Sequence, residues 1–184
     1  VIEIMGRDTG WLAASAYAAT HLCGAPELIY LPEVKFSKEK FYADIKKIYE
    51  QKGKALVVVS EGIVGEDGIE IGASGTKDAF GHSELAGAAS NLARMITNDT
   101  GIKTRAIELS LLQRCAAHCG CTTDVEEAVG VGRTALQKAV DGVTDVMIGI
   151  KRLSDKPYAI EYECVPLSNV ANAIKYVDEK YMND

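Results

Sequence analysis

One valine-rich run limits the folds open to this chain more than any other segment. Residues 54–60 read KALVVVS, a continuous apolar run that ends at Glu61 and Gly62. A strand that is apolar on both sides is typical of a parallel sheet covered on both faces. We therefore expect residues 54–60 to form a buried parallel strand.

Strands and helices are predicted to alternate along most of the chain. Expected strands cover residues 1–5, 25–32, 54–60, 104–114, 143–151 and 157–165, and expected helices cover residues 10–21, 38–52, 83–98, 123–141 and 167–176. Residues 63–80 are expected to form a long loop with a small hairpin. This alternation predicts a single α/β domain over residues 1–184, with a mostly parallel Rossmann-like sheet and helices on both faces. The last two strands are expected to pair as an antiparallel hairpin near the C-terminus.

Residue types at the expected helix ends support these boundaries. Asp8 or Thr9 is expected to cap the first helix, and Gly53 and Gly101 are expected to end two others. Residues 123–126, TDVE, have the pattern of a capping box that opens the helix over residues 123–141.

Composition argues against several classes of function. The net charge is −6 and no basic block occurs, which argues against a nucleic-acid partner. No apolar run approaches the roughly 20 residues of a membrane span, so no membrane partner is expected. The five cysteines are an odd number scattered through the chain, which favours reduced thiols in a cytoplasmic protein.

Charged residues follow three of the expected strands. Arg7, Glu61 and Arg114 each lie at or just past a carboxyl end. In a parallel sheet these ends share one edge, where open α/β sheets bind ligands. Arginine binds phosphate through parallel hydrogen bonds, and a carboxylate accepts hydrogen bonds from hydroxyls. The expected ligand carries both phosphate and hydroxyl groups, and the alternative is a set of ion pairs between loops.

The N–H groups at the start of the first helix strengthen this expectation. They follow Arg7 by a few residues and, when unpaired, favour an anion and phosphate above all.

Arg105 begins the strand that is expected to end near Arg114, nine residues later. An extended strand would separate the two guanidinium groups by roughly 30 Å. Arg105 is therefore either an ordinary surface residue or part of a site shared with another subunit.

Cys115, His118, Cys119 and Cys121 form the only other cluster of chemically active side chains. Structural zinc usually takes two separated pairs of ligands, and this chain has one cluster without a second pair. No metal ligands are therefore expected, although a metal-binding or redox protein remains a competing interpretation.

Three segments together give the chain a resemblance to a known family. VIEIMGRDTGWLAA, VVVSEG and KTRAIELSLLQRCAAH resemble segments of the phosphofructokinases, and of their diphosphate-dependent and long-chain bacterial subgroup in particular. The resemblance runs in order over the whole chain. It implies that Met5, Gly6 and Arg7 hold fructose 6-phosphate, and that Arg7 also faces the transferring phosphoryl group as a catalytic residue. Glu61 matches the glutamate that binds the sugar.

The third segment carries the remaining implied contacts. Arg114 matches an arginine that binds the 6-phosphate, and Arg105 matches one that reaches the 6-phosphate site of a neighbouring subunit, which implies a homo-oligomer. Leu111 stands where many members have His or Tyr, and Cys115-Ala116 stands where many have Gly-Gly. Leu111 thus alters one expected sugar contact.

Segments that the family carries before Met-Gly-Arg do not occur in this chain. They are the Gly-rich donor loop, a Gly-Gly-Asp segment that binds Mg²⁺ and a Thr-Ile-Asp-Asn-Asp segment with the catalytic base. Because the chain also begins directly on a strand, we expect a fragment of a larger two-domain glycolytic phosphofructokinase. It would bind fructose 6-phosphate but be inactive alone, with Mg²⁺ and the donor, diphosphate or ATP, held by the absent part. The alternative is a non-catalytic sugar-phosphate-binding module.

Overall fold

A computed structural model describes residues 1–77, 83–85 and 87–182 of the chain. Its contacts divide the chain into two compact units, one of Val1–Cys115 with Lys175–Asp184 and the other of Ala116–Ile174. We call them unit 1 and unit 2 and describe each by itself. The expectation of a single domain over residues 1–184 stays a prediction.

Unit 1 contains a four-stranded parallel sheet. Its strand order is β2 (Leu28–Tyr30), β3 (Val57–Ser60), β1 (Ile2–Ile4) and β6 (Ile107–Glu108). Ile2 is in register with Val58 on one side and with Ile107 on the other. All four residues of β3 are buried, so the prediction of a buried parallel strand is confirmed.

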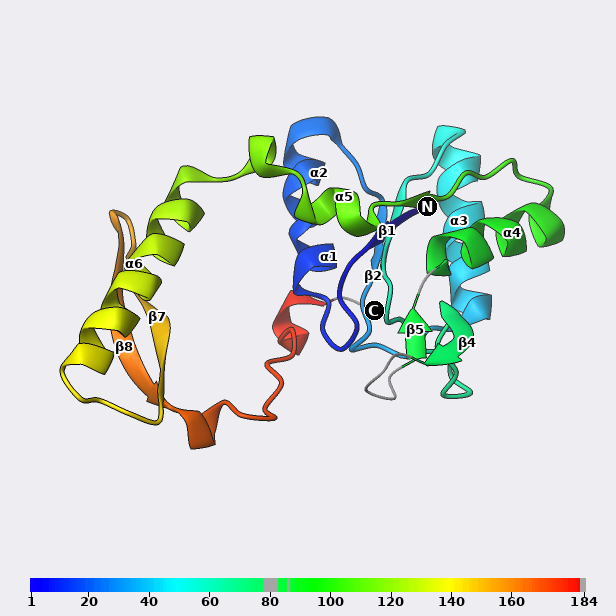
Figure 1. Ribbon diagram of the computed structural model, residues 1–184. Helices are drawn as coiled ribbons and strands as arrows, with labels where there is room; N and C mark the ends of the chain where they lie inside the picture. Colours follow the sequence, from blue (N-terminus) through cyan, green and yellow to red (C-terminus); the bar gives the residue numbers. More distant parts are fainter. Residues whose placement is uncertain (78–82, 86, 183–184) are drawn as a thin grey trace. The chain divides into compact units, whose positions relative to one another are not determined.

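Helices cover both faces of this sheet, as predicted (Figure 1). Helices α3 (Lys38–Lys52) and α4 (Ala88–Thr100) pack on the face that includes Val57 and Val59. Helix α1 (Trp11–Ser15), which α2 (Tyr17–Cys23) follows, packs on the opposite face with Val58. Alternate residues of β3 therefore enter two separate cores, which explains why its sequence is apolar throughout.

The helix ends were predicted with mixed success. Gly53 and Gly101 end α3 and α4 with φ values of 67° and 71°, a left-handed conformation that glycine adopts without strain. The first expected helix is divided into α1 and α2 at Ala16, and its N-cap is Gly10 rather than Asp8 or Thr9.

The expected strand over residues 104–114 is wrong beyond its first part. Strand β6 has only two residues, and the chain then forms the short helix α5 (Ser110–Arg114). The extended conformation ends at Leu109, which has helical angles of φ −71° and ψ −36°, and Ser110 follows with a φ of 40°. The apolar run LSLL misled the prediction because the periodicity of so short a run does not distinguish a strand from a helix.

The segment before α4 also differs from the prediction. Strands β4 (Ala73–Lys77) and β5 (Ser83–Leu85) pair antiparallel, but β5 lies beyond residues 63–80, where the small hairpin was expected. Residues 83–85 are therefore strand rather than the start of a helix, and α4 begins at Ala88 after Gly87. Residues 78–80, the end of the expected loop, and residues 81–82 after it lie outside the described residues.

Unit 2 consists of a helix and a hairpin. The short helix η1 (Ala117–Cys119) leads to α6 (Thr122–Val140), and strands β7 (Val146–Asp155) and β8 (Tyr158–Pro166) pair antiparallel as predicted. The capping box at residues 123–126 is not formed. The helix starts before Thr123, so its N-cap is Cys121. The side chain of Cys121 makes no capping hydrogen bond.

The helix expected over residues 167–176 is not formed. Only the single turn η2 (Leu167–Asn169) is present, and Asn172 has a φ of 60°, which is incompatible with a continuing helix. The chain then returns to unit 1, where η3 (Glu179–Tyr181) is the last element among the described residues.

Candidate functional site

The candidate site lies at the carboxyl edge of the sheet in unit 1. Three chain segments leave the sheet there: residues 5–7 after β1, residues 61–62 after β3, and α5 after β6. Because β1 lies between β3 and β6, its extension is flanked on both sides. The N–H of Glu61 donates to the carbonyl oxygen of Ile4 at 3.0 Å, which continues the pairing of β1 and β3 past the strand end.

Gly6 is held by the residues that end β3. Its N–H donates to Glu61 Oε1 at 3.0 Å, and its carbonyl oxygen accepts a hydrogen bond from the Ser60 hydroxyl. Its φ is 149°, and a Cβ at this position would lie 2.6 Å from the carbonyl oxygen of Thr9. Glycine is therefore required here by both conformation and space.

Gly62 fixes the backbone of Arg7. A Cβ at Gly62 would overlap the carbonyl oxygen of Arg7, so the two segments approach more closely than any other residue type would permit. Arg7 itself is half-buried. Its side chain thus starts from a backbone that two neighbouring segments hold in place.

Helix α5 is joined to β1 on the other side. The N–H of Met5 donates to Gln113 Oε1 at 3.0 Å, and Arg114 Nε lies 3.5 Å from Met5 Sδ. The predicted residues Met5, Gly6, Glu61 and Arg114 are therefore linked by direct contacts. Sequence reasoning missed Gln113, next to Arg114, because its partner lies 108 residues away.

Glu3 is a buried carboxylate below this edge that sequence reasoning also missed. Its Oε2 accepts a hydrogen bond from the N–H of Ala89 at 2.9 Å, in the first turn of α4. Burial raises the pKa of Glu3, the bond to Ala89 opposes that rise, and the neighbouring carboxylates of Glu108 and Glu61 raise the pKa further. Glu108 accepts from the Ser90 hydroxyl at 2.6 Å. The signal in the sequence that could have identified Glu3 was an acidic residue within an otherwise apolar strand.

The amino end of α1 does not offer the anion site that was expected. The N–H of Gly10 donates to both carboxylate oxygens of Glu33, at 2.9 and 3.1 Å, and Glu33 also accepts from the N–H of Val177 at 3.0 Å. The Trp11 indole donates to the carbonyl oxygen of Lys175 at 2.7 Å. A side-chain carboxylate thus binds the start of this helix and ties it to the returning chain.

The remaining two predicted residues occupy different places. Arg105 precedes β6 at the amino edge of the sheet, where its carbonyl oxygen accepts from the amino group of Val1 at 2.8 Å. Leu111 lies on α5 and is exposed. The expected separation of about 30 Å between Arg105 and Arg114 is too long, because α5 rises only about 1.5 Å per residue. The two arginines still flank opposite ends of β6.

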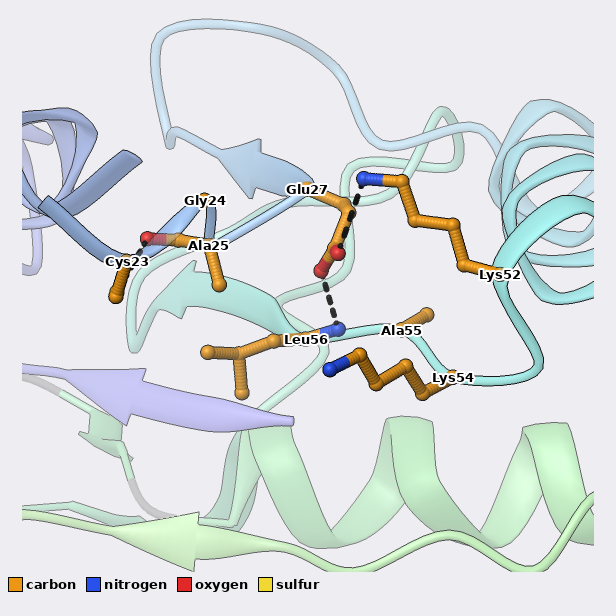
Figure 2. Close-up of a pocket in the computed structure, with 8 residues that line it drawn as sticks. All are labelled: Cys23, Gly24, Ala25, Glu27, Lys52, Lys54, Ala55 and Leu56. Carbon is orange, nitrogen blue, oxygen red and sulfur yellow. Dashed lines mark hydrogen bonds and ion pairs between the residues drawn. The ribbon is translucent and has the colours of Figure 1, made fainter. Parts of the chain in front are cut away.

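Two cavities lie at the amino edge rather than at the candidate site. One, of about 310 Å³, is shown in Figure 2, where Glu27 pairs with Lys52 at 3.3 Å and accepts from the N–H of Leu56 at 2.8 Å. The other, of about 490 Å³, is lined in part by Lys54 and Arg105. Both border segments that precede β2 or β3, so they are separated from Arg7 by the length of the sheet.

Metal ligands do not converge in the part of the chain that the structure describes. No group of three or more His, Cys, Asp or Glu side chains among these residues is arranged to hold a metal ion. Cys115, Cys119 and Cys121 are exposed free thiols, as are Cys23 and Cys164. Within the same described residues, no helix is long and apolar enough to cross a membrane.

Comparison with known proteins assigns the family. The sequence profile described as phosphofructokinase matches residues 1–137. The chain belongs to the phosphofructokinase family. The matched residues include all of the sheet and every predicted site residue.

Individual members of the phosphofructokinase family resemble the whole chain. This chain is 40% identical to pyrophosphate–fructose 6-phosphate 1-phosphotransferase of Halomonas elongata, with 100% of this chain covered. It is 38% identical to the enzyme of that name from Methylococcus capsulatus, again with 100% of this chain covered. Pyrophosphate-dependent phosphofructokinase of Nitrosospira multiformis superposes with a TM-score of 0.82 at 34% identity, covering 100% of this chain and 42% of that one. The chain spans 44% of the length of the first two relatives.

Proposed function

We propose that this chain forms the fructose 6-phosphate-binding part of an enzyme that transfers a phosphoryl group to the sugar's 1-hydroxyl. The observation that carries the proposal is the set of contacts joining Glu61 to Gly6 and Arg114 to Met5, beside Arg7. Two guanidinium groups and one carboxylate on a single sheet edge suit a ligand with both phosphate and hydroxyl groups.

Glu61 and Arg114 are proposed to bind opposite ends of the sugar phosphate. A carboxylate has two oxygens with about four lone pairs, so Glu61 retains acceptor positions for a sugar hydroxyl while Oε1 accepts from Gly6. Arg114 is exposed and carries the planar donor fork that matches a phosphate. We assign it the 6-phosphate, with the apolar side chains of Met5 and Leu111 beside the sugar.

Arg7 is proposed to stabilise the phosphoryl group during transfer. Phosphoryl transfer depends mainly on positioning and on cations that balance charge on the equatorial oxygens. Arg7 suits this role because the contacts at Gly6 and Gly62 fix its backbone before substrate arrives. We assign no residue of this chain as the base that removes the proton from the 1-hydroxyl.

Diphosphate is the proposed donor, with ATP as the alternative outcome of a donor assay. The support is the similarity to relatives that are named pyrophosphate–fructose 6-phosphate 1-phosphotransferases. We propose that donor, Mg²⁺ and the catalytic base are held outside residues 1–184, in a longer protein that contains this chain. Bound there, Mg²⁺ would neutralise the donor phosphates.

Arg105 is proposed to act across a subunit interface in a homo-oligomer. Its place before β6, at the edge opposite Arg114, supports this, since one sugar phosphate cannot contact both edges of one sheet. We further propose that the protein acts in glycolysis and lies in the cytoplasm; the five free thiols support the compartment.

Calorimetric titration of this chain with fructose 6-phosphate tests the binding part of the proposal. We expect binding that Arg7→Ala and Arg114→Ala each weaken by about tenfold or more, since hydrogen bonds to charged groups contribute about 1.5–3 kcal/mol. Lys138→Ala, in α6 of unit 2, is the control and should leave binding unchanged. Repeating the titration with the longer protein separates a failure of the fragment from a failure of the proposal.

An activity assay distinguishes the enzyme from the non-catalytic module. We expect no turnover of fructose 6-phosphate with Mg²⁺ and either donor for residues 1–184 alone, and clear turnover for the longer protein. Turnover by the chain alone would contradict the proposed division of roles. Sugar-phosphate binding without turnover by the longer protein would favour the binding module.

A further inference from the structure

The segment after β1 is held by side chains that follow the two neighbouring strands, β3 and β6. On the β3 side, Glu61 Oε1 accepts from the N–H of Gly6 at 3.0 Å. On the β6 side, Gln113 Oε1 accepts from the N–H of Met5, also at 3.0 Å. Two successive backbone N–H groups are thus fixed in opposite directions, one by a carboxylate and one by a neutral amide.

Gln113 connects this segment to a helix that has little support of its own. Helix α5 has only five residues, no side chain caps its N-terminus, and Ser110 in its first turn has a φ of 40°. Helices this short are not stable in isolation. The half-buried Gln113 supplies a hydrogen bond to the central strand that the helix cannot provide for itself.

The same contact fixes the residue that follows. Arg114 comes directly after Gln113, is exposed, and meets β1 through the 3.5 Å contact of Nε with Met5 Sδ. That contact to sulfur is weak, so it does not by itself determine where the guanidinium lies. The Met5 backbone is therefore held by Gln113 while the Met5 side chain touches Arg114, which makes the three residues one structural unit.

We propose that Gln113 is a positioning residue that sets the location of the Arg114 guanidinium relative to Arg7. This role rests on the proposed function, because it is expressed through binding of the sugar's 6-phosphate. A neutral amide suits the position because it accepts the Met5 N–H without bringing a negative charge beside the phosphate. Gln113 acts through Arg114 and does not itself contact the reacting atoms.

A double-mutant cycle in the longer protein tests this role. Gln113→Met keeps the length of the side chain but removes the acceptor, and Arg114→Ala removes the group on which it acts. The four proteins are compared by KM for fructose 6-phosphate, KM for diphosphate, kcat and melting temperature. The exposed neighbour Leu112, replaced by Gln, is the matched control on the same helix.

We expect Gln113→Met to raise KM for fructose 6-phosphate about tenfold, the usual loss for one hydrogen bond, with KM for diphosphate unchanged. In the Arg114→Ala background the same change should raise it less than about twofold, since coupled residues are not additive. Leu112→Gln should leave all four quantities unchanged. Should Gln113→Met fail to fold, Gln113→Glu keeps an acceptor for Met5, and its added charge should raise the same KM at neutral pH.

Three results would overturn the role. An unchanged KM for fructose 6-phosphate in Gln113→Met would show that the contact does not position the site. An equal rise with and without Arg114 would show that Gln113 acts independently of it. A parallel rise in KM for diphosphate would indicate general disruption. A wild-type protein that binds and turns over no fructose 6-phosphate would instead remove the proposed function, and this role with it.

Discussion

The two units of this chain bury their apolar side chains to very different degrees. Unit 1 contains two core clusters, with Phe41, Leu92 and Val59 fully buried. In unit 2, which is described in full, Ile148 is the only buried apolar residue, and α6 exposes 68% of Leu136. Every predicted site residue belongs to unit 1.

The two units also differ in how far apart in sequence their contacting segments lie. In unit 1, β1 pairs with β3, which lies about half the unit's length away in sequence. It also pairs with β6, which lies almost the full length of the unit away. Unit 2 joins one helix to a hairpin of adjacent strands. A site whose residues must be held from several directions requires the first arrangement, because only non-local pairing brings separate segments to one edge.

The largest expected effect concerns the core of unit 1. Phe41 is fully buried against Tyr30, Phe36 and Tyr42, so Phe41→Ala should lower the free energy of unfolding by about 3–5 kcal/mol. Leu136→Ala in unit 2 should change it by less than about 0.5 kcal/mol. Urea unfolding of the 184-residue chain, followed by Trp11 fluorescence and circular dichroism, measures both. Similar losses in the two variants would contradict the comparison.

Substitutions of two arginines, one in each unit, test whether the units differ in their contribution to catalysis. Arg7→Ala in the longer protein should lower kcat by about 10²–10³-fold, the usual cost of removing one group that stabilises transition-state charge. Arg152, which pairs with Asp155 at 2.6 Å in unit 2, is the control, and Arg152→Ala should change kcat less than about twofold. Steady-state assays with fructose 6-phosphate and diphosphate measure both. A comparable loss at Arg152 would place catalytic groups in unit 2.

Substitutions of two glycines, one in each unit, test how closely the backbone is packed in each unit. Gly62→Ala would push a Cβ into the Arg7 backbone and should cost about 1–3 kcal/mol of stability. Gly132 lies within α6 with no atom near its missing Cβ, so Gly132→Ala should add about 0.5–1 kcal/mol. Denaturant midpoints of both variants test the prediction. A neutral Gly62→Ala would show that the approach to Arg7 is not constrained.

The smallest expected effect is the pH dependence due to Glu3. Burial raises its pKa above the ordinary value of 4.5, so the folded state favours the protonated form. The stability that Glu3 contributes is therefore present at low pH and lost as pH rises through the raised pKa.

Glu3→Gln keeps an oxygen for the N–H of Ala89 and removes this dependence. The variant should gain stability relative to wild type between pH 4 and pH 7, as judged by urea unfolding at both values. A constant difference across that range would mean that Glu3 does not titrate with a raised pKa.

Some features could be predicted because they depend on neighbouring residues. The alternation of strands and helices, the valine-rich β3 and the β7–β8 hairpin follow from local patterns and were predicted correctly. The position of the candidate site at the carboxyl edge of the sheet was predicted as well, since the carboxyl ends of parallel strands lie together. The capping box was wrong because α6 starts before Thr123, and the last helix was wrong because Asn172 has a φ of 60°.

The amino-acid sequence by itself determined which side chains are available to the site, namely Arg7, Glu61 and Arg114, and that strand ends carry them. Only the tertiary structure decided what holds them. Gln113 reaches Met5, and Glu33 takes the start of α1, through contacts between residues far apart in the chain. The physical reason is that a hydrogen bond needs its partner within about 3 Å, and a pattern of neighbouring residues carries no information about which distant partner arrives there.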